Sequence, residues 1–286
     1  KDGACLKLYD GHDWKWFRAG LLHTDMEYLR RHWSGKKSSA PVFEKRHQKY
    51  FLRFSYTEEV TLSKTPVKDQ LICSVDLGIN TDAVCSIMRS DGTVLDRKFI
   101  NFPSEKDRLS HVLGRIRRFQ KEHGSKQIGS RWAYAKRLNT ELARKTARSI
   151  TEYAHENHAD VIVFEYLEMK GKISGKKRQK LHLWKKREIQ TMCEHKAHRY
   201  GIRVSRVCAW NTSRLAYDGS GPVSRDPKNH SLCVFQSGKQ YNCDLSASYN
   251  IGARYWIREI IKTLPETERS SLEAKVPAVK RRTSCV

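Results

Sequence analysis

The stretch Leu71–Gly78, with the sequence LICSVDLG, decides the fold. Its first five residues, 71–75, are apolar or small and predict a short buried strand, which the Asp-Leu-Gly turn stops. A second strand is expected at Ala83–Met88 and a third at Thr93–Ile100. A Ser-Asp-Gly hairpin turn at residues 90–92 joins the second strand to the third. This part of the chain therefore predicts a three-stranded antiparallel meander.

The downstream sequence predicts helices that alternate with two further strands. Apolar residues recur at helical spacing in the helices, whereas the strands are short apolar runs. The order resembles that of the ribonuclease H fold, so the fold class is α/β, with a mixed sheet flanked by helices. The expected elements are a helix opened by a capping box of Ser104 and Asp107, a helix spanning Leu138–Ala154, a strand at Val161–Glu165, a Lys/Arg-rich helix, a strand at Gly201–Val207, a hairpin at Ser231–Tyr241, and a helix at Leu245–Leu264 closed by Pro265.

The chain divides into three regions by composition. Residues 1–68 are rich in Trp and Phe and include the run Lys49–Tyr56, which favours β structure, so this region is expected to be part of a β-rich domain. Residues 69–264 hold the α/β domain, with an insertion at about 209–243, and residues 265–286 form a tail. Because the chain opens without methionine, we expect it to be truncated at its N-terminus.

The charge balance indicates a polyanionic partner. The 55 Lys and Arg residues outnumber the 31 Asp and Glu residues, which gives a net charge of +24. Such a surplus destabilises a compact chain unless nucleic acid or another polyanion relieves it, although a basic protein without any chemistry fits equally well. No apolar run is long enough to span a membrane, and no signal segment opens the chain. The eight cysteines form no C-x-x-C pair, so reduced thiols in the cytoplasm are expected rather than disulfides or zinc.

Three acidic residues stand where this fold brings chain ends together. Asp76 ends the first strand, Glu165 ends the fourth and Asp244 opens the last helix. Their carboxylates are expected to converge and to hold two Mg²⁺ ions, the arrangement that phosphodiester hydrolysis requires. Each acid has an ordinary structural alternative: Asp76 as a turn residue, Glu165 as a surface acid at a strand end, and Asp244 as a helix N-cap or a first-turn acid stabilised by the helix dipole.

These acids lie in motifs that resemble those of the TnpB and type V CRISPR effector family. Val75–Ile79 resembles the first RuvC motif of that family, and Ile162–Leu167 resembles the second. Asp244–Ile251 is similar to the third, and Thr212-Ser213 matches a Thr-Ser pair that follows the fifth strand. The resemblance spans roughly residues 45–264 and suggests that the first region is part of a wedge-like domain.

The resemblance implies an RNA-guided DNA endonuclease with a RuvC site, whose partners are a guide RNA and a target DNA. It implies that Asp76, Glu165 and Asp244 are catalytic Mg²⁺ ligands, and it implies no small-molecule substrate. The protein would act in the bacterial cytoplasm, at the nucleoid. Trp184 is a candidate for base stacking, with core packing as the alternative. The basic residues expected to bind nucleic acid, with a solvated surface as the alternative, are Arg144, Arg148, Lys176, Lys177, Arg178, Lys185, Lys186 and Arg187.

Two departures from the family pattern are visible. Members usually carry a four-cysteine zinc ribbon before the third motif, and the corresponding positions here hold Ala216, Gly219, Val234 and Ser237. A hairpin without metal is expected in its place, although Cys208, Cys233 and Cys243 with His230 could form an unusual zinc site. The usual Asn after the third-motif aspartate is replaced by Ser246.

Other functions are compatible with parts of the pattern. The main alternative is an RNA-guided DNA-binding protein that lacks cleavage and acts like a repressor. A sugar-kinase or actin-like ATPase also begins with a strand and Asp-x-Gly, but it needs a second such unit, which is not found. A junction resolvase would bind four-way junctions as a dimer without RNA.

Overall fold

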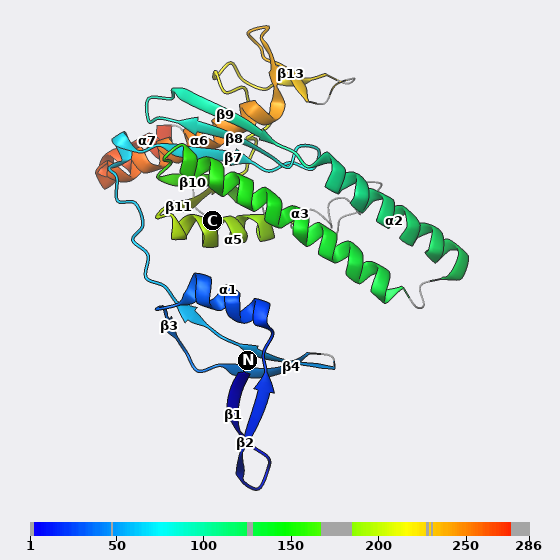
Figure 1. Ribbon diagram of the computed structural model, residues 1–286. Helices are drawn as coiled ribbons and strands as arrows, with labels where there is room; N and C mark the ends of the chain where they lie inside the picture. The colour runs from blue at the N-terminus through cyan, green and yellow to red at the C-terminus, as the bar shows by residue number, and fades with distance from the viewer. Residues whose placement is uncertain are drawn as a thin grey trace. The chain divides into compact units, whose positions relative to one another are not determined.

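The chain folds into two compact units, Lys1–Val60 and Thr61–Val286, and each is described by itself (Figure 1). The structure is a computed structural model and describes residues 3–46, 48–124, 128–166, 185–226, 229 and 231–275. The stretch that follows Val60 is tied to the second unit, because the hydroxyls of Ser63 and Thr65 each donate to Asp160 Oδ1 at 2.6 Å.

The N-terminal unit consists of paired strands and one helix, and none of its described residues is buried. Strand β1 pairs with β2, β3 with β6, and β4 with β5, all antiparallel. The prediction of β structure from aromatic density is confirmed here, because the run Lys49–Tyr56 contains strand β5. The rings of Phe43 and Tyr50 stack with their centroids 5.3 Å apart. The elements are β1 Gly3–Tyr9, β2 Trp14–Gly20, α1 His23–Trp33, β3 Lys37–Ser38, β4 Val42–Arg46, β5 Lys49–Arg53 and β6 Tyr56–Thr57.

The second unit is built on a five-stranded mixed sheet with the strand order β11-β10-β7-β8-β9. Strands β7, β8 and β9 form the expected antiparallel meander, while β10 runs parallel to β7 and β11 parallel to β10. The first and fourth strands of this sheet in chain order, β7 and β10, are therefore neighbours. A short 3₁₀ helix, η1, spans Val67–Asp69, and the strands are β7 Ile72–Asp76, β8 Ala83–Met88, β9 Val94–Ile100, β10 Val161–Tyr166 and β11 Arg203–Cys208.

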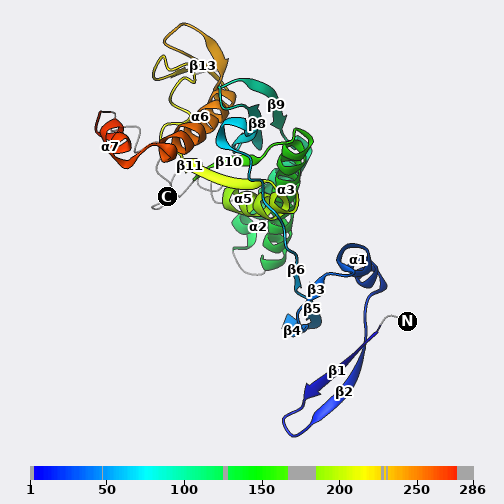
Figure 2. The ribbon, with the colours of Figure 1, turned by 90° about the vertical axis from the view of Figure 1, so that its left-hand side faces the viewer.

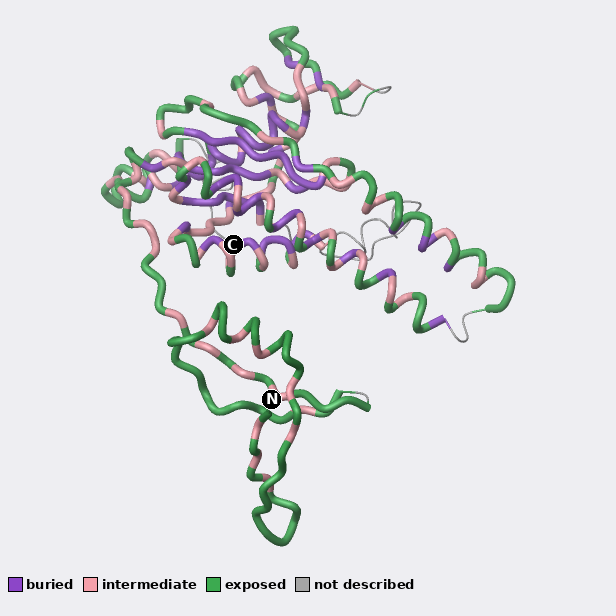
Figure 3. Tube along the Cα trace, viewed as in Figure 1, coloured by how far each residue is buried: buried purple, intermediate pink, exposed green. Residues whose placement is uncertain are grey.

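Helices cover both faces of this sheet. One face packs against α3 and α5 through a core that includes Cys73, Ile150 and Ile189, and the other packs against α6 through Ile72 and Trp256. Successive residues of β7 thus enter opposite cores, as the period of two in a strand requires. Figures 1 and 2 show the two layers, and Figure 3 shows that the buried residues concentrate in the sheet. The helices of this unit are α2 Pro103–His123, α3 Gly129–Glu156, α5 Lys186–Arg199, α6 Cys243–Thr263 and α7 Glu266–Lys275.

The start of α2 differs from the prediction. The capping box of Ser104 and Asp107 is wrong, because the helix already begins at Pro103 and Phe102 is the N-cap, without a side-chain cap. Proline is well suited to the first helical position because its ring presets φ and its missing N–H would have no partner there. The buried carboxylate of Asp82 accepts instead from the Phe102 N–H at 2.9 Å, so the chain enters the helix from a fixed point.

The insertion between β11 and α6 is a small three-stranded sheet, β12-β13-β14. The predicted hairpin is confirmed, with Gly238 in the left-handed region at φ 82° in its turn. Ala216, at a position where relatives carry a ribbon cysteine, packs into a small apolar core of the insertion. Its strands are β12 Ser224–Arg225, β13 Leu232–Val234 and β14 Gln240–Asn242.

Five of the described cysteines are buried and none of the described ones is disulfide-bonded: Cys73, Cys85, Cys193, Cys233 and Cys243 lie in the apolar cores. Within the described ranges, no helix combines the length and the apolar character that would let it cross a membrane.

Candidate active site

Asp76 and Glu165 lie side by side at the carboxyl ends of neighbouring parallel strands. The register pairs Phe164 with Val75, so the next residue on each strand is one of the two acids. Glu165 is buried, whereas Asp76 retains partial exposure. The apolar runs that precede both acids fix this register, because a shift by one residue would turn the buried faces outward.

Asp244 reaches the same place from the first turn of α6. The N-cap of α6 is Asn242, whose side chain accepts from the Leu245 N–H at 2.9 Å. Asp244 is therefore not the N-cap, but it does stand in the first turn, as the other half of its structural alternative holds. The side chain of Thr81, in the loop between β7 and β8, lowers the pKa of Asp244.

The pKa values of the three acids show that they share one electrostatic environment. Burial raises the pKa of Asp76 well above its ordinary value, and the charges of Glu165 and then Asp244 raise it further. Burial also raises the pKa of Glu165 and that of Asp244. The three acids that the sequence singled out are thus near enough for the charges of Glu165 and Asp244 to act on Asp76, and their roles stay a prediction.

Cationic side chains offset part of this negative charge. Arg225, from β12 in the insertion, lowers the pKa of both Asp76 and Asp244. Arg254 of α6 and the buried Lys186 of α5 lower the pKa of Glu165. None of these neighbours could be linked to the acids from sequence, because no local pattern connects a residue of the insertion with a strand end far away in the chain.

The loop after Asp76 requires glycine. A Cβ atom on Gly78 would stand 2.5 Å from the carbonyl oxygen of Thr81, which is backbone and cannot move aside. The Gly78 N–H donates to the carbonyl of Asp82 at 3.4 Å, which closes the loop on itself. The Asp-Leu-Gly sequence is therefore part of a tight turn, which agrees with the ordinary structural alternative for Asp76.

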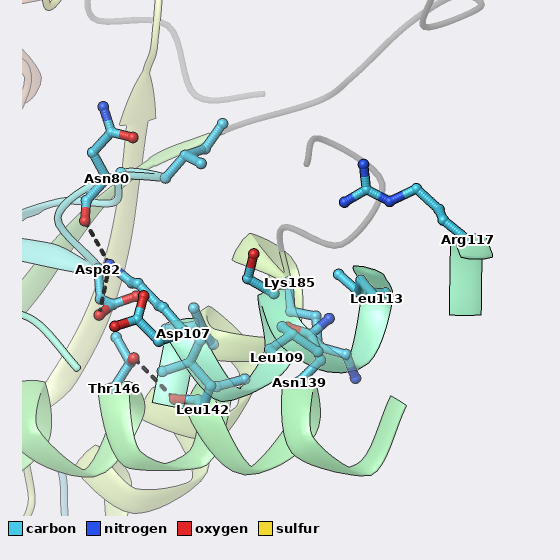
Figure 4. Close-up of a pocket in the computed structure, with 16 residues that line it drawn as sticks. Asn80, Asp82, Asp107, Leu109, Leu113, Arg117, Asn139, Leu142, Thr146 and Lys185 are labelled. Atoms are coloured by element: carbon cyan, nitrogen blue, oxygen red, sulfur yellow. Dashed lines mark hydrogen bonds and ion pairs between the residues drawn. The ribbon is translucent and has the colours of Figure 1, made fainter. Parts of the chain in front are cut away.

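The same loop forms one wall of a cavity of about 490 Å³, whose other walls come from α2, α3 and the start of α5 (Figure 4). Leu109 and Leu113 of α2 and Leu142 of α3 supply apolar lining. Lys106 also lines the cavity. Its ammonium group lies 3.1 Å from the Asp82 carboxylate and donates to the carbonyl of Asn80.

The donor set suits a divalent metal. Carboxylate oxygens are the ligands that Mg²⁺ prefers, and a bound cation would relieve the repulsion that raises the pKa of Asp76. Among the residues that the structure describes, no group of three or more His, Cys, Asp or Glu side chains already stands in metal-binding geometry. The acids fit the metal by chemistry and by their place in the fold, and their side chains must converge further to share an ion.

Comparisons with known proteins agree with the motifs. A model of the "Cas12f1-like, TNB domain" family matches residues 187–251. A TnpB-like protein of Aquifex aeolicus (strain VF5) is 25% identical over 247 residues, covering 78% of this chain and 79% of the relative. A TnpB-like protein of Acidianus two-tailed virus is 28% identical over 204 residues, covering 64% of this chain and 42% of the relative. The predicted resemblance to the TnpB and type V effector family is confirmed.

The fold is also shared with a solved member of that group. The protein chain in the cryo-EM structure of a Cas12f1–sgRNA–target DNA complex superimposes with a TM-score of 0.50 at 20% identity, covering 73% of this chain. This chain spans about half of that protein, since the match covers 54% of it. The segment matched by the TNB-domain model runs from α5 through the insertion into α6, and so includes Arg225, Thr212 and Asp244. It also includes Ser246, the departure from the TnpB pattern, whose buried hydroxyl has no hydrogen-bond partner among the described residues.

The predicted nucleic-acid-binding residues have varied surroundings. Arg144 lies 3.8 Å from Glu141, and Arg148 lies 2.6 Å from Glu152 on the same helix. Lys185 pairs with Glu188 and donates to the Thr140 hydroxyl. Lys186 is buried near Glu165, and Arg187 lines a small pocket with Tyr166 and Arg206. Outside the described residues lie Lys176, Lys177, Arg178, Trp184 and His230.

Proposed function

We propose that this chain carries the nuclease site of an RNA-guided DNA endonuclease of the TnpB type. The observation that carries the proposal is the shared electrostatic environment of Asp76, Glu165 and Asp244, which come from two neighbouring strands and one helix. Acids so far apart in sequence gain nothing from proximity in folding, because their repulsion costs stability. A functional site is the reason for keeping them together.

The sheet topology supports a ribonuclease H-like, RuvC-type assignment. An antiparallel meander followed by two parallel strands on the side of β7 is the arrangement expected of that fold. The fold shared with the Cas12f1 complex agrees with it. The acids then occupy the end of the sheet where the central strands finish, which is where α/β folds place their sites.

The proposed chemistry is two-metal phosphodiester hydrolysis. Bound Mg²⁺ ions would supply an activated water and neutralise charge on the leaving oxygen. Asp76, Glu165 and Asp244 would hold these ions, and the side chain of Thr81 lowers the pKa of Asp244, which favours its charged form. Arg225 places a positive charge beside Asp76 and Asp244, where it would attract the phosphate of the strand to be cut.

The proposed partners are a guide RNA and a target DNA. The printed description of the Cas12f1 complex includes both an sgRNA and a target DNA. In this chain, the surplus of cations supports such partners. The exposed end of the α2–α3 hairpin carries Arg115, Arg117, Arg118 and Lys121, for which no acidic partner exists among the described residues. Together with Arg144, Arg148, Lys185 and Arg187, they are the proposed phosphate contacts, and such a protein would act in the bacterial cytoplasm at the nucleoid.

A second candidate function is guided DNA binding without cleavage. It is favoured by the finding that, in the described part of the chain, no acidic group is already arranged as a metal site, and by Ser246 in the third motif. The three clustered acids favour the nuclease.

One experiment separates these functions. The protein is purified with its copurifying RNA, and Mg²⁺-dependent cutting of DNA matched to that RNA is measured beside an Asp76→Ala variant. The nuclease proposal predicts guided cutting that Asp76→Ala abolishes while RNA and DNA binding persist. Intact guided binding with uncut DNA for both proteins would show the binding function, and absence of RNA and DNA binding would refute both.

A further inference from the structure

A row of polar residues on α6 holds the end of β11 and the chain segment that follows it. Asn250, Arg254 and Arg258 stand four residues apart and so share one face of the helix. Arg258 donates to the carbonyl of Arg206 at 2.7 Å. Arg254 donates to the carbonyl of Trp210, also at 2.7 Å.

The row continues at Asn250, which donates to the carbonyls of Thr212 at 2.9 Å and Leu215 at 2.8 Å. As the donors advance along α6 from residue 250 to 258, the carbonyls that accept from them go back along the chain from residue 215 to 206. The helix and the held segment therefore run antiparallel. The held segment leaves the sheet at Cys208 and contains Asn211 in the left-handed region at φ 58°. Asn250 and Arg254 thus supply side-chain donors to carbonyls of this irregular segment.

This segment delivers one hydroxyl to the candidate site. Thr212 is 3% exposed, and its Oγ1 donates to Glu165 Oε1. Another acceptor within reach is the carbonyl of Ala209 at 3.3 Å, but a hydroxyl has one proton and the carboxylate is the stronger acceptor. The Glu165 backbone is held separately, because Gln190 donates to its carbonyl at 2.8 Å.

The hydroxyl has a defined consequence for Glu165. Because Oε1 accepts from Thr212, rotation of the Glu165 carboxylate is restricted, while the charge of Glu165 still acts on Asp76. A metal ligand that is fixed by such a hydrogen bond binds better than one that rotates, because less order is lost on binding. Among the described residues, no hydrogen bond connects α6 to the side chain of Asp76.

We propose that Thr212 is a positioning residue that orients Glu165 for divalent metal binding, and that Asn250 holds Thr212 in place. The inference rests on the proposed nuclease function for its purpose, but its geometry depends only on this chain. Thr212 touches neither metal nor DNA in this proposal and acts through Glu165 alone.

The test compares Thr212→Val, which keeps the shape and loses the hydroxyl, with Thr212→Ser, which keeps the hydroxyl and loses a methyl group. Mn²⁺ affinity is measured by electron paramagnetic resonance on the protein without DNA, and melting temperature is measured alongside. Thr212→Val is expected to weaken Mn²⁺ binding by about 10- to 100-fold, the usual effect of losing such a hydrogen bond. Thr212→Ser is expected to bind Mn²⁺ like the wild type.

A double-mutant cycle tests the part played by Asn250. If Asn250 acts through Thr212, Asn250→Ala weakens Mn²⁺ binding in the wild type but not further in Thr212→Val. Additive losses would overturn that link.

Three results would overturn the role of Thr212. In the first, Thr212→Val binds Mn²⁺ as tightly as the wild type. In the second, Thr212→Val and Thr212→Ser lose Mn²⁺ affinity equally and both melt at a lower temperature, and in the third, Asp76→Ala leaves Mn²⁺ binding unchanged. Failure of the proposed function looks different. In that case Mn²⁺ still binds and still depends on the Thr212 hydroxyl, but the wild type never cuts guided DNA.

Discussion

Asp76, Glu165 and Asp244 could be recognised from sequence because each stands at the end of a readable element. Two stand at the ends of buried apolar runs, and the third stands in the first turn of a long helix. What the sequence could not supply was their neighbours. Arg225 and Thr212 belong to irregular or inserted segments, whose paths no periodicity predicts, although Thr212 was already visible as part of a family-like Thr-Ser pair.

Removing the charge of Arg225 is predicted to impair cleavage more than nucleic-acid binding. Arg225→Gln should lower the rate by about 100-fold, the size expected for losing a group that stabilises developing charge. Because Arg225 lowers the pKa of Asp76 and Asp244, its loss should also move the acid side of the pH–rate profile to higher pH. Arg214→Gln, an exposed arginine of the same segment, is the control. A matching loss in both variants would contradict a specific role for Arg225.

The raised pKa of Asp76 predicts a pH-dependent stability without metal. A carboxyl whose pKa is raised in the folded state contributes stability below its ordinary pKa of 3.8 and loses it as pH rises through the folded value. In EDTA, Asp76→Asn should therefore melt higher than the wild type at pH 7, by at least about 2 °C. The gap should close near pH 4. A gap that is independent of pH would show that repulsion among the acids is not its cause.

At the scale of elements, strands β8 and β13–β14 and the α6 helix followed the sequence closely, since apolar runs, turn residues and a proline stop mark them. The capping of α2 did not, because Pro103 outcompetes the Ser104 box and the partner of the Phe102 N–H, Asp82, lies 20 residues away. Local rules predict which element forms, whereas distant side chains decide how it begins.

The tight loop between β7 and β8 predicts a sharp difference between two glycines. Gly78→Ala should lower the free energy of unfolding by about 1–3 kcal/mol, because its Cβ would overlap the Thr81 carbonyl. It should also weaken Mn²⁺ binding, since the loop carries Thr81, whose side chain lowers the pKa of Asp244. Gly114→Ala in α2 is the control: open space surrounds that Cβ, and alanine should stabilise the helix by about 0.5–1 kcal/mol. Chemical denaturation measures both, and equal effects would contradict the steric account.

The end of the α2–α3 hairpin is predicted to bind phosphate. Replacing Arg115, Arg117, Arg118 and Lys121 by Gln should weaken nucleic-acid binding and reduce the salt dependence of the affinity by about one unit of slope per lost contact. The control replaces Lys262 and Arg269, which lie 3.0 Å from Glu259 and 3.9 Å from Glu266. Fluorescence anisotropy at several salt concentrations gives both slopes. Because the first set removes four charges and the control two, equal losses per removed charge would mean that only net charge matters.

At the scale of the whole molecule, charge and composition predicted a nucleic-acid partner but could not say where it binds. The net charge of +24 is a property of the chain, while the cations that lack acidic partners are a property of the folded surface. The N-terminal unit shows the same limit in another way. Its aromatic residues predicted strands correctly, yet none of its described residues is buried, so its strands form without a core of their own.

The most direct test of the central claim is to locate Mn²⁺ by anomalous scattering in crystals of the protein bound to RNA and DNA. We predict two ions about 3.5–4 Å apart, each in contact with carboxylate oxygens among Asp76, Glu165 and Asp244. Ions bound elsewhere, or the three carboxylates facing apart with no metal between them, would contradict the account.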